Sequence, residues 1–349
     1  MGTAFAVSII VLRKISQKII YGVFLRSYKG KLTKMKKWLL TATLLVCMLC
    51  EMHAQYDAHF THYWKMQNFY NPAGAGFEKE MIVYAAYSNQ MTGFEGNPKT
   101  MLINIDAPIP FIKSDHNLGL GIVNDEIGNF SNQRLYLNYA YGFKLFKGRF
   151  VLGAQVGLVN SSFENKDLNF GGNGSNNDPA FPSGNADGNK LDLGAGILYQ
   201  HKYFHAGISA FHLNAPLIEL GEKNEIQIDP YLNFIAGGNI PLKNPLLSIQ
   251  PSLMVMTDFV SWRADISAKA TYSYDEKEFF GGITYSPMTS VAVFLGIEMM
   301  NITLSYGYEI FTSGIGAANG NHDLYLGYKI DLGTFKKGKN KHNSIRILQ

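Results

Sequence analysis

Cysteine is absent from most of this sequence, because the two cysteines of the chain are Cys47 and Cys50. A body without cysteine has no disulfide framework, no thiol nucleophile and no cysteine ligands for a metal ion. These three classes of site are therefore excluded for residues 51–349.

Long apolar runs and charged side chains are scarce as well. No stretch after residue 54 approaches the roughly 18 consecutive apolar residues of a membrane-spanning helix, so a helical membrane protein is excluded. Charged residues make up 17% of the chain, whereas it contains 35 Gly, 20 Tyr and 23 Phe. This composition favours twisted strands in lipid over a solvated surface.

The formal net charge of +4 does not describe the body of the chain. Residues 1–54 contain nine of the 31 Lys and Arg but one of the 27 Asp and Glu, which leaves 22 basic and 26 acidic side chains in residues 55–349. A nucleic-acid-binding protein needs a basic face on its folded body. The mildly acidic body therefore gives no basis for nucleic-acid binding.

Residues 35–54 have the pattern of a secretory signal peptide. Lys36 and Lys37 precede an apolar run over residues 38–50, and a small residue, Ala54, ends an imperfect cleavage site. The run is too short for a transmembrane helix, and neither cysteine follows a small residue as a lipoprotein would require. We expect cleavage after Ala54, and we interpret residues 1–34 as an upstream extension from a start called too early, or else as a long basic leader.

Strict alternation of apolar and mixed residues is the dominant pattern after the leader. Residues 134–145 show it clearly, because Leu135, Leu137 and Tyr139 alternate with Arg134, Tyr136 and Asn138. Successive side chains of a strand point to opposite faces, so each run has one apolar face and one mixed face. Runs of about 9–11 residues fit a tilted membrane crossing, and aromatic residues near their ends fit an aromatic girdle.

The fold class predicted is therefore all-β, a closed transmembrane antiparallel β-barrel of about fourteen strands over residues 79–332. The predicted strands lie near 79–89, 98–107, 117–125, 131–145, 148–160, 189–200, 202–214, 230–240, 246–257, 261–273, 277–286, 289–298, 301–310 and 321–332. We expect long loops at 161–188, 215–229 and 311–320 on the outer side, short turns on the periplasmic side, and a basic periplasmic tail over 333–349.

The segment before the first strand does not alternate. Residues 56–76 are rich in aromatic residues and end in Asn71-Pro72-Ala73-Gly74, a turn or extended geometry before a hinge. We favour an N-terminal plug over residues 55–78 that packs inside the barrel. The alternative interpretation is a contact surface for a partner.

Patterns that carry catalysis or bind cofactors are weak in this sequence. The loop 161–188 offers Asp and Asn oxygens at spacings that match no calcium site. Gly119-Leu-Gly121 lacks the third glycine of a dinucleotide fingerprint. His201, His205 and His212 have no hydrolase or metalloprotease motif around them, and His201 is expected in a turn. We predict no enzyme activity, no cofactor and no metal site.

Several motifs together resemble the PorP/SprF family of the type IX secretion system of Bacteroidetes. The resemblance covers nearly all of residues 55–332. It is carried by Asn71-Pro72-Ala73 with Ala75-Gly76, by Gly93-Phe94-Glu95-Gly96-Asn97-Pro98-Lys99-Thr100, by Gly119-Leu120-Gly121 with Asp125 and Gly128, and by Gly320-Asn321-His322-Asp323-Leu324 with Tyr328. The family usually has Gln-Trp where this chain has Gln90-Met91, so an aromatic contact is lost there.

The resemblance implies a FadL-like barrel of the outer membrane that acts as an accessory component of the type IX machinery. Such a protein supports export or surface attachment of cargo, including gliding adhesins, and contacts a periplasmic peptidoglycan-linked lipoprotein as well as outer-membrane lipid. An alternative function is an outer-membrane channel for small or hydrophobic solutes. The candidate partner-contact or motif residues are Asn71, Pro72, Gly93, Phe94, Gly96, Pro98, Asp125 and His322, although the glycines and prolines are better explained as turn and bulge residues.

Overall fold

The computed structural model describes residues 58–109, 114–164, 185–221, 224–312 and 320–332. The chain separates into two compact units, residues 1–52 and 53–349, and all described residues belong to the second unit. The predicted signal peptide at 35–54, the extension at 1–34, most of the loop at 161–188 and the tail at 333–349 lie outside the described residues.

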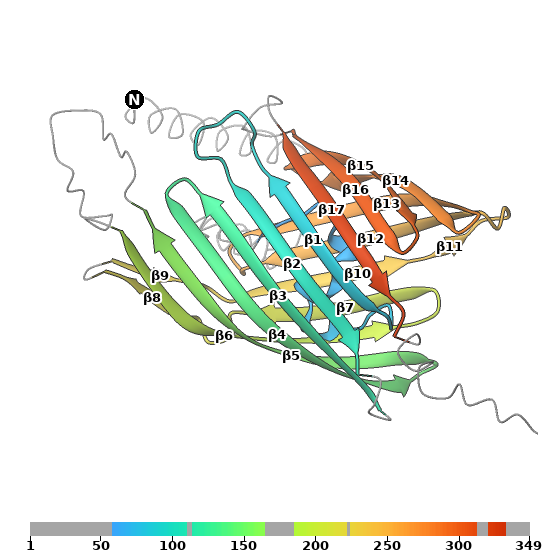
Figure 1. Cartoon of the computed structure of the whole chain (residues 1–349), viewed down its shortest axis with the longest axis horizontal. Coiled ribbons are helices and arrows are strands. Elements are labelled where there is room, and N and C mark those ends of the chain that lie inside the picture. Colours follow the sequence, from blue (N-terminus) through green and yellow to red (C-terminus); the bar gives the residue numbers. More distant parts are fainter. Residues whose placement is uncertain (1–57, 110–113, 165–184, 222–223, 313–319, 333–349) are drawn as a thin grey trace, which may run out of the picture. The chain divides into compact units, whose positions relative to one another are not determined.

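Fourteen antiparallel strands form a closed ring, in which each strand pairs with its neighbours in chain order and β1 pairs with β17 (Figure 1). The strands of the ring are β1 (Met81–Asn89), β2 (Lys99–Pro108), β3 (Asp115–Ile127), β4 (Phe130–Leu145), β5 (Gly148–Phe163), β6 (Ala186–Gln200), β7 (Phe204–Phe211), β10 (Tyr231–Gly238), β12 (Leu247–Thr257), β13 (Trp262–Tyr274), β14 (Lys277–Ser286), β15 (Ser290–Met299), β16 (Ile302–Phe311) and β17 (Asn321–Ile330). The prediction of a closed fourteen-strand barrel is confirmed.

The barrel has an apolar outer face and a mostly polar inner face. On β4, Leu135 and Leu137 lie on the outer face and are 47% and 50% exposed. Asn138 lies on the inner face of the same strand and is 0% exposed. A soluble sandwich would show the reverse arrangement. An apolar exterior of this kind is stable in hydrocarbon, where the closed ring also leaves no strand edge with unpaired backbone groups.

Type I′-like turns connect several hairpins at one end of the barrel. The residues at their tips have positive φ, with 45° and 63° at Phe146 and Lys147, and 52° and 65° at Met300 and Asn301. This geometry matches the right-handed twist of the adjoining strands. We call this end the short-turn rim, and we call the opposite end, which carries the connections 90–98 and 212–230, the long-loop rim.

The predicted loop 215–229 is more ordered than we expected. It contains a hairpin of β8 (Leu217–Leu220) and β9 (Asn224–Gln227), which forms a sheet separate from the ring. Ile218 and Leu220 are buried against Val159, so the hairpin covers apolar side chains near the long-loop rim. Its strands have four residues each, too few for the alternation to be distinguished from loop sequence.

The boundaries of β5, β6 and β7 also differ from the prediction, and the structure contains one further short strand. β5 continues to Phe163 and β6 begins at Ala186, so both strands extend into the predicted loop 161–188. β7 ends at Phe211, because His212 adopts a positive φ of 53° and turns the chain away from the ring. A two-residue strand, β11 (Ile240–Pro241), pairs with β12 beyond the end of β10.

Candidate functional site

The lumen of the barrel is occupied by the chain's own N-terminal segment, residues 58–78, which we call the plug. It contains the short helices η1 (Tyr63–Lys65), α3 (Gln67–Tyr70) and η2 (Pro72–Gly74), drawn in blue within the ring of strands (Figure 1). Phe60, Tyr63 and Met66 are 0% exposed. None of the described helices is long and apolar enough to cross a membrane. The predicted fold with a plug-like N-terminal segment is confirmed.

The plug turns sharply at the Asn-Pro motif. Asn71 is extended at φ −154°, and its side-chain oxygen accepts a hydrogen bond from the Ala73 amide at 2.9 Å. Its side-chain amide donates to the backbone oxygens of Ile197 on β6 and Ile208 on β7, at 3.1 and 3.4 Å. Asn71 therefore caps η2 and also attaches the turn to the barrel wall, which leaves no free polar group on its side chain for a partner.

Glycines in the wall make room for this turn. A Cβ atom added at Gly153 on β5 would lie under 3.0 Å from the backbone of Pro72 and Ala73. A Cβ added at Gly196 on β6 would overlap the Asn71 side chain. The plug backbone thus touches the strand backbone directly, which is a close approach that only glycine permits.

Uncharged side chains hold the middle of the plug. The Asn68 amide donates to Asn104 Oδ1 at 2.9 Å, and the Asn138 amide donates back to Asn68 Oδ1 at 2.9 Å. On the other side of the lumen, Tyr63 Oη lies 3.0 Å from Ser252 Oγ and donates to Ser267 Oγ at 2.9 Å. Burial raises the pKa of Tyr63 to about 12, so this hydroxyl remains a donor at any physiological pH.

A buried ionic network fixes the start of the plug near the long-loop rim. His59 Nε2 lies 3.0 Å from Asp265 Oδ2, and Arg263 bridges Asp265 and Glu309 at 3.1 and 2.7 Å. The Thr61 amide donates to Asp323 Oδ2 at 2.6 Å. Because the side chains of Asp265 and Glu309 are 0% and 2% exposed, their charges depend on Arg263 for compensation.

A second, more exposed ionic network fixes the plug at the short-turn rim. Lys65 Nζ lies 3.1 Å from Glu298, and Lys329 joins Glu298 to Glu78, where the plug leads into β1. Burial opposes ionisation of Glu78, but Lys65 and Lys329 outweigh it and hold the pKa of this carboxyl below its ordinary value. Lys269 Nζ lies 4.0 Å from the centre of the Trp64 ring, a cation–π contact between wall and plug.

A histidine at the centre of the plug is kept neutral by its surroundings. His62 is 0% exposed, and its Nε2 atom lies 2.8 Å from Ser305 Oγ. The rings of Phe294 and Tyr325 lie about 6 Å away, at 6.2 and 6.1 Å between centroids. Burial among these rings lowers the pKa of His62 from 6.5 to about 3, so the plug seats with an uncharged imidazole.

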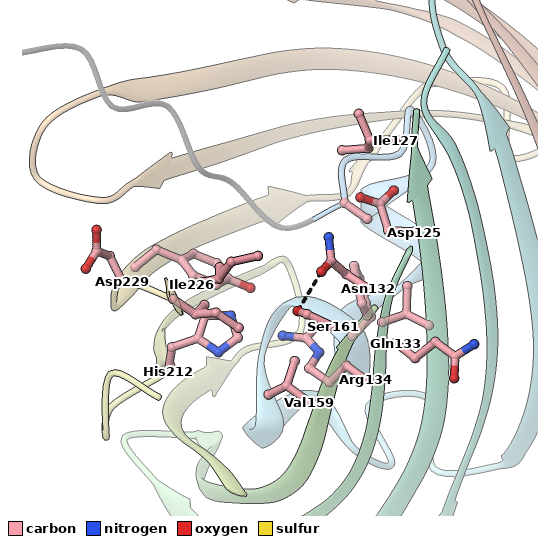
Figure 2. A pocket seen from close by; sticks show the side chains of 15 residues that line it. Asp125, Ile127, Asn132, Gln133, Arg134, Val159, Ser161, His212, Ile226 and Asp229 are labelled. Atoms are coloured by element: carbon pink, nitrogen blue, oxygen red, sulfur yellow. Dashed lines mark hydrogen bonds between the residues drawn. The ribbon is translucent and has the colours of Figure 1, made fainter. Parts of the chain in front are cut away.

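A cavity of about 280 Å³ remains between the plug and the long-loop rim (Figure 2). Arg134, Val159 and Ser161 line it from β4 and β5, and His212, Ile226 and Asp229 face them from the other side. Ala58 and Phe69 of the plug also line it. The Arg134 guanidinium lies over the Phe69, Tyr136 and Phe211 rings at 5.4, 5.5 and 5.6 Å, so one cation is held among three aromatic faces.

The predicted motif residues fall in four separate places. Asn71 and Pro72 belong to the plug. Gly93, Phe94, Gly96 and Pro98 lie in the β1–β2 connection at the long-loop rim, where Phe94 is 51% exposed and Gly93 and Gly96 have φ values of 105° and 68°. The Gly96 carbonyl accepts the Gly128 amide from the next hairpin at 2.9 Å, which supports a turn role for both glycines.

The other two motif residues do not form one site either. Asp125 accepts the Thr100 hydroxyl and borders the cavity. His322 lies on the outer side of β17, with Nδ1 2.7 Å from Tyr306 Oη and its ring 5.0 Å from Tyr308, as part of the aromatic girdle. The structure therefore does not gather the eight residues into a single contact site.

The other patterns considered in the sequence have structural explanations. Gly119 and Gly121 lie within β3, with the Asn68 and Tyr136 side chains packed over them and no helix following. His201 occupies a turn, as expected, and His212 Nδ1 lies 2.8 Å from the buried Asp192. Within the described ranges, no group of three or more His, Cys, Asp or Glu side chains is arranged to hold a metal ion.

Arg134, Arg263, Asp265, Glu298 and Lys329 hold the plug or border the cavity, yet sequence reasoning did not select them. The signal available was a charged residue on the inner face of a strand predicted to cross a membrane. Such residues are costly in hydrocarbon and face the interior of the protein.

Comparison with known proteins gives one family and several distant structures. The family described as "Type IX secretion system membrane protein PorP/SprF" matches residues 52–328. No curated protein matches the chain. Similar solved structures include the CymD monoaromatic hydrocarbon channel, with TM-score 0.46, 10% identity and coverage of 76% of this chain and 92% of that chain. They also include a Pseudomonas aeruginosa FadL homologue, with TM-score 0.44, 13% identity and coverage of 74% of this chain and 92% of that chain. The Pseudomonas putida toluene transporter TodX has TM-score 0.43, 10% identity and coverage of 75% of this chain and 92% of that chain.

Proposed function

Because the chain belongs to the PorP/SprF family of type IX secretion system membrane proteins, we propose that it is an accessory barrel that supports export or surface attachment of particular cargo proteins. The family and the closed barrel place it in the outer membrane. Family membership implies contact with other components of the secretion system. Our proposal adds specific partners: a secreted cargo or gliding adhesin on the outer side, and a peptidoglycan-linked lipoprotein on the periplasmic side.

The observation that carries this proposal is the attachment of the plug at both rims. The plug bonds to Asp265 and Asp323 near the long-loop rim and to Glu298 and Lys329 at the short-turn rim. A plug that fills the lumen and is bonded to the wall at both rims supports a scaffold that acts through its rims, rather than an open pore. We propose no catalytic step.

Deletion of the coding sequence tests the proposal. We expect surface display of at least one type IX cargo to be lost while other outer-membrane proteins remain at normal levels. Complementation with the wild-type sequence should restore display, and affinity purification from outer membranes should recover components of the secretion system. Unchanged surface display of every type IX cargo in the deletion strain would contradict the proposal.

A channel for small or hydrophobic solutes is the second candidate function. The observation in its favour is the cavity of about 280 Å³ at the long-loop rim, which combines apolar walls with a buried cation. Reconstituted vesicles distinguish the two functions. A variant that lacks residues 58–76 serves as the open control. Solute uptake or conductance by the intact protein at the level of this control would favour the channel.

A further inference from the structure

One half of the short-turn rim is basic. Three successive connections of this half, between β4 and β12, each contain one exposed lysine and no acidic residue, namely residues 146–147 with Lys147, residues 201–203 with Lys202 and residues 239–246 with Lys243. Among the described residues, none of the three ammonium groups is paired with a carboxylate. We call these three connections the basic half of the rim.

The opposite half of the same rim is acidic. The turn between β13 and β14 is Asp275-Glu276, and Glu78 and Glu80 lie just before β1. All four of these side chains are exposed. A partner with negative charge is therefore attracted to the basic half and repelled by the acidic half, so the rim distinguishes two sides of the barrel.

Exposed aromatic rings accompany the lysines of the basic half. Phe146 is 82% exposed and has a φ of 45°, although a bulky side chain is disfavoured at positive φ and this kind of turn prefers Asn-Gly. Tyr203 is 55% exposed, and Lys202 Nζ lies 5.4 Å from the centre of its ring. The turn itself does not require an aromatic residue at position 146, which favours a use for this ring outside the protein.

The basic half continues directly from the aromatic girdle on the outer face. Phe143 and Phe150 are cross-strand neighbours with ring centres 5.3 Å apart, and Phe150 in turn pairs with Tyr199. The Tyr199 hydroxyl donates to the backbone oxygen of Phe146 at 2.8 Å, which joins the girdle to the turn. Aromatic girdles lie at the membrane interface, so the next residues toward the rim lie at the level of the lipid headgroups.

We propose that the basic half of the short-turn rim binds anionic phospholipid headgroups. This inference goes beyond the proposed function. Lys147, Lys202 and Lys243 supply the charge that attracts phosphate groups, and the Phe146 and Tyr203 rings enter the interfacial layer beside them. An acidic protein would also be attracted to the lysines. Continuity with the lipid-facing girdle favours the lipid, because it places the lysines against the membrane.

The acidic half has the complementary role. Anionic headgroups are repelled from Asp275 and Glu276, so the barrel is held to the lipid at one side of the rim. The network of Glu78, Glu298 and Lys329 lies on the other side, where it remains accessible from water. Lipid and a soluble partner could therefore occupy the two halves of the rim at the same time.

Quenching by brominated lipids tests the proposal at single positions. Residues 51–349 contain no cysteine, so a bimane label can be attached to Leu145→Cys or to Ile302→Cys in the full-length chain with Cys47→Ala and Cys50→Ala. Both positions face outward beside a two-residue turn, the first at the basic half and the second on the other side. In vesicles of phosphatidylcholine and phosphatidylglycerol, we expect brominated phosphatidylglycerol to quench position 145 several-fold more than an equal amount of brominated phosphatidylcholine. Position 302 should show no such preference.

Paired lysine variants provide the control for charge. Lys147→Gln with Lys202→Gln should reduce the preference at position 145 by about fivefold for each lysine removed. Lys79→Gln with Lys277→Gln removes the same charge from the other half and should leave the preference unchanged. Heat-modifiable migration checks that each barrel is folded. Equal preference at both labelled positions, or a preference that survives loss of Lys147 and Lys202, would overturn the proposal. Absence of any preference at position 145 would overturn it in favour of an acidic protein partner.

Discussion

Replacement of Gly153 by valine is the sharpest test of how the plug is held. Gly153 lies on β5 against the backbone of Pro72 and Ala73, and an added Cβ would lie under 3.0 Å from both, where ordinary contact begins at 3.4 Å. Neither backbone can yield as a flexible side chain would. The plug must therefore move away from the wall at the η2 turn.

The cost of this movement has two parts. Overpacking of a well-packed interior costs about 1–3 kcal/mol. Displacement of the turn also weakens the hydrogen bonds from Asn71 to Ile197 and Ile208, each with a net contribution of about 1 kcal/mol. We expect Gly153→Val to destabilise the seated plug by about 3 kcal/mol while the strand ladder of the barrel persists.

Limited proteolysis of the purified barrel measures the effect, with cleavage in residues 58–78 as the readout and heat-modifiable migration as the check on the barrel. Ala154→Val is the matched control, because Ala154 neighbours Gly153 on the same strand and faces outward. We expect rapid cleavage of the plug in Gly153→Val alone. Equal resistance of the two variants would refute the argument that direct backbone contact with β5 positions the plug.

Three further predictions concern the charged and titratable groups of the plug. Arg263→Leu should destabilise the protein in denaturant unfolding by about 3 kcal/mol or more, because two buried carboxylates lose their cation. Lys329→Met also removes a cation from two carboxylates, but these are partly exposed, so we expect the free energy of unfolding to fall by about 1 kcal/mol. Equal losses of stability in Arg263→Leu and Lys329→Met would contradict the argument from burial. The pKa of His62 is lowered to about 3 from 6.5, so between these pH values the unfolded chain binds more protons than the folded protein and the free energy of unfolding falls as the pH falls. From pH 6.5 to pH 5 this loss should reach about 2 kcal/mol. The pH-dependent loss should disappear in His62→Gln.

The sequence predicted the ring of strands well because each strand repeats one simple requirement. A side chain that faces lipid must be apolar, so the alternation is visible wherever a strand crosses the membrane, as at Leu135 and Leu137. The inner face obeys no such rule. Leu198 faces inward and is buried against Ala73 and Ala75, because the plug rather than water covers it.

The arrangement of the plug could not be predicted because its contacts are long-range. Tyr63 meets Ser267, which is 204 positions away in the chain, and His59 meets Asp265, which is 206 positions away. The motif Asn71-Pro72 indicated a turn correctly, but no local pattern identifies Gly153 or Gly196 as the wall that accepts it. Short β8 and β9 were missed for a related reason, since their order depends on apolar contact with Val159.

The two ionic networks differ in a way that bears on how the plug could be released. The network at the long-loop rim is buried, so removal of one charge leaves the others without compensation in a medium of low dielectric constant. The network at the short-turn rim is partly exposed, so water can replace each of its ion pairs at small cost. A partner that competes for Glu78 or Lys329 would therefore loosen the end of the plug at the short-turn rim first. The end of the plug at the long-loop rim would stay attached through Asp265, so a change induced at the short-turn rim would be confined to that end.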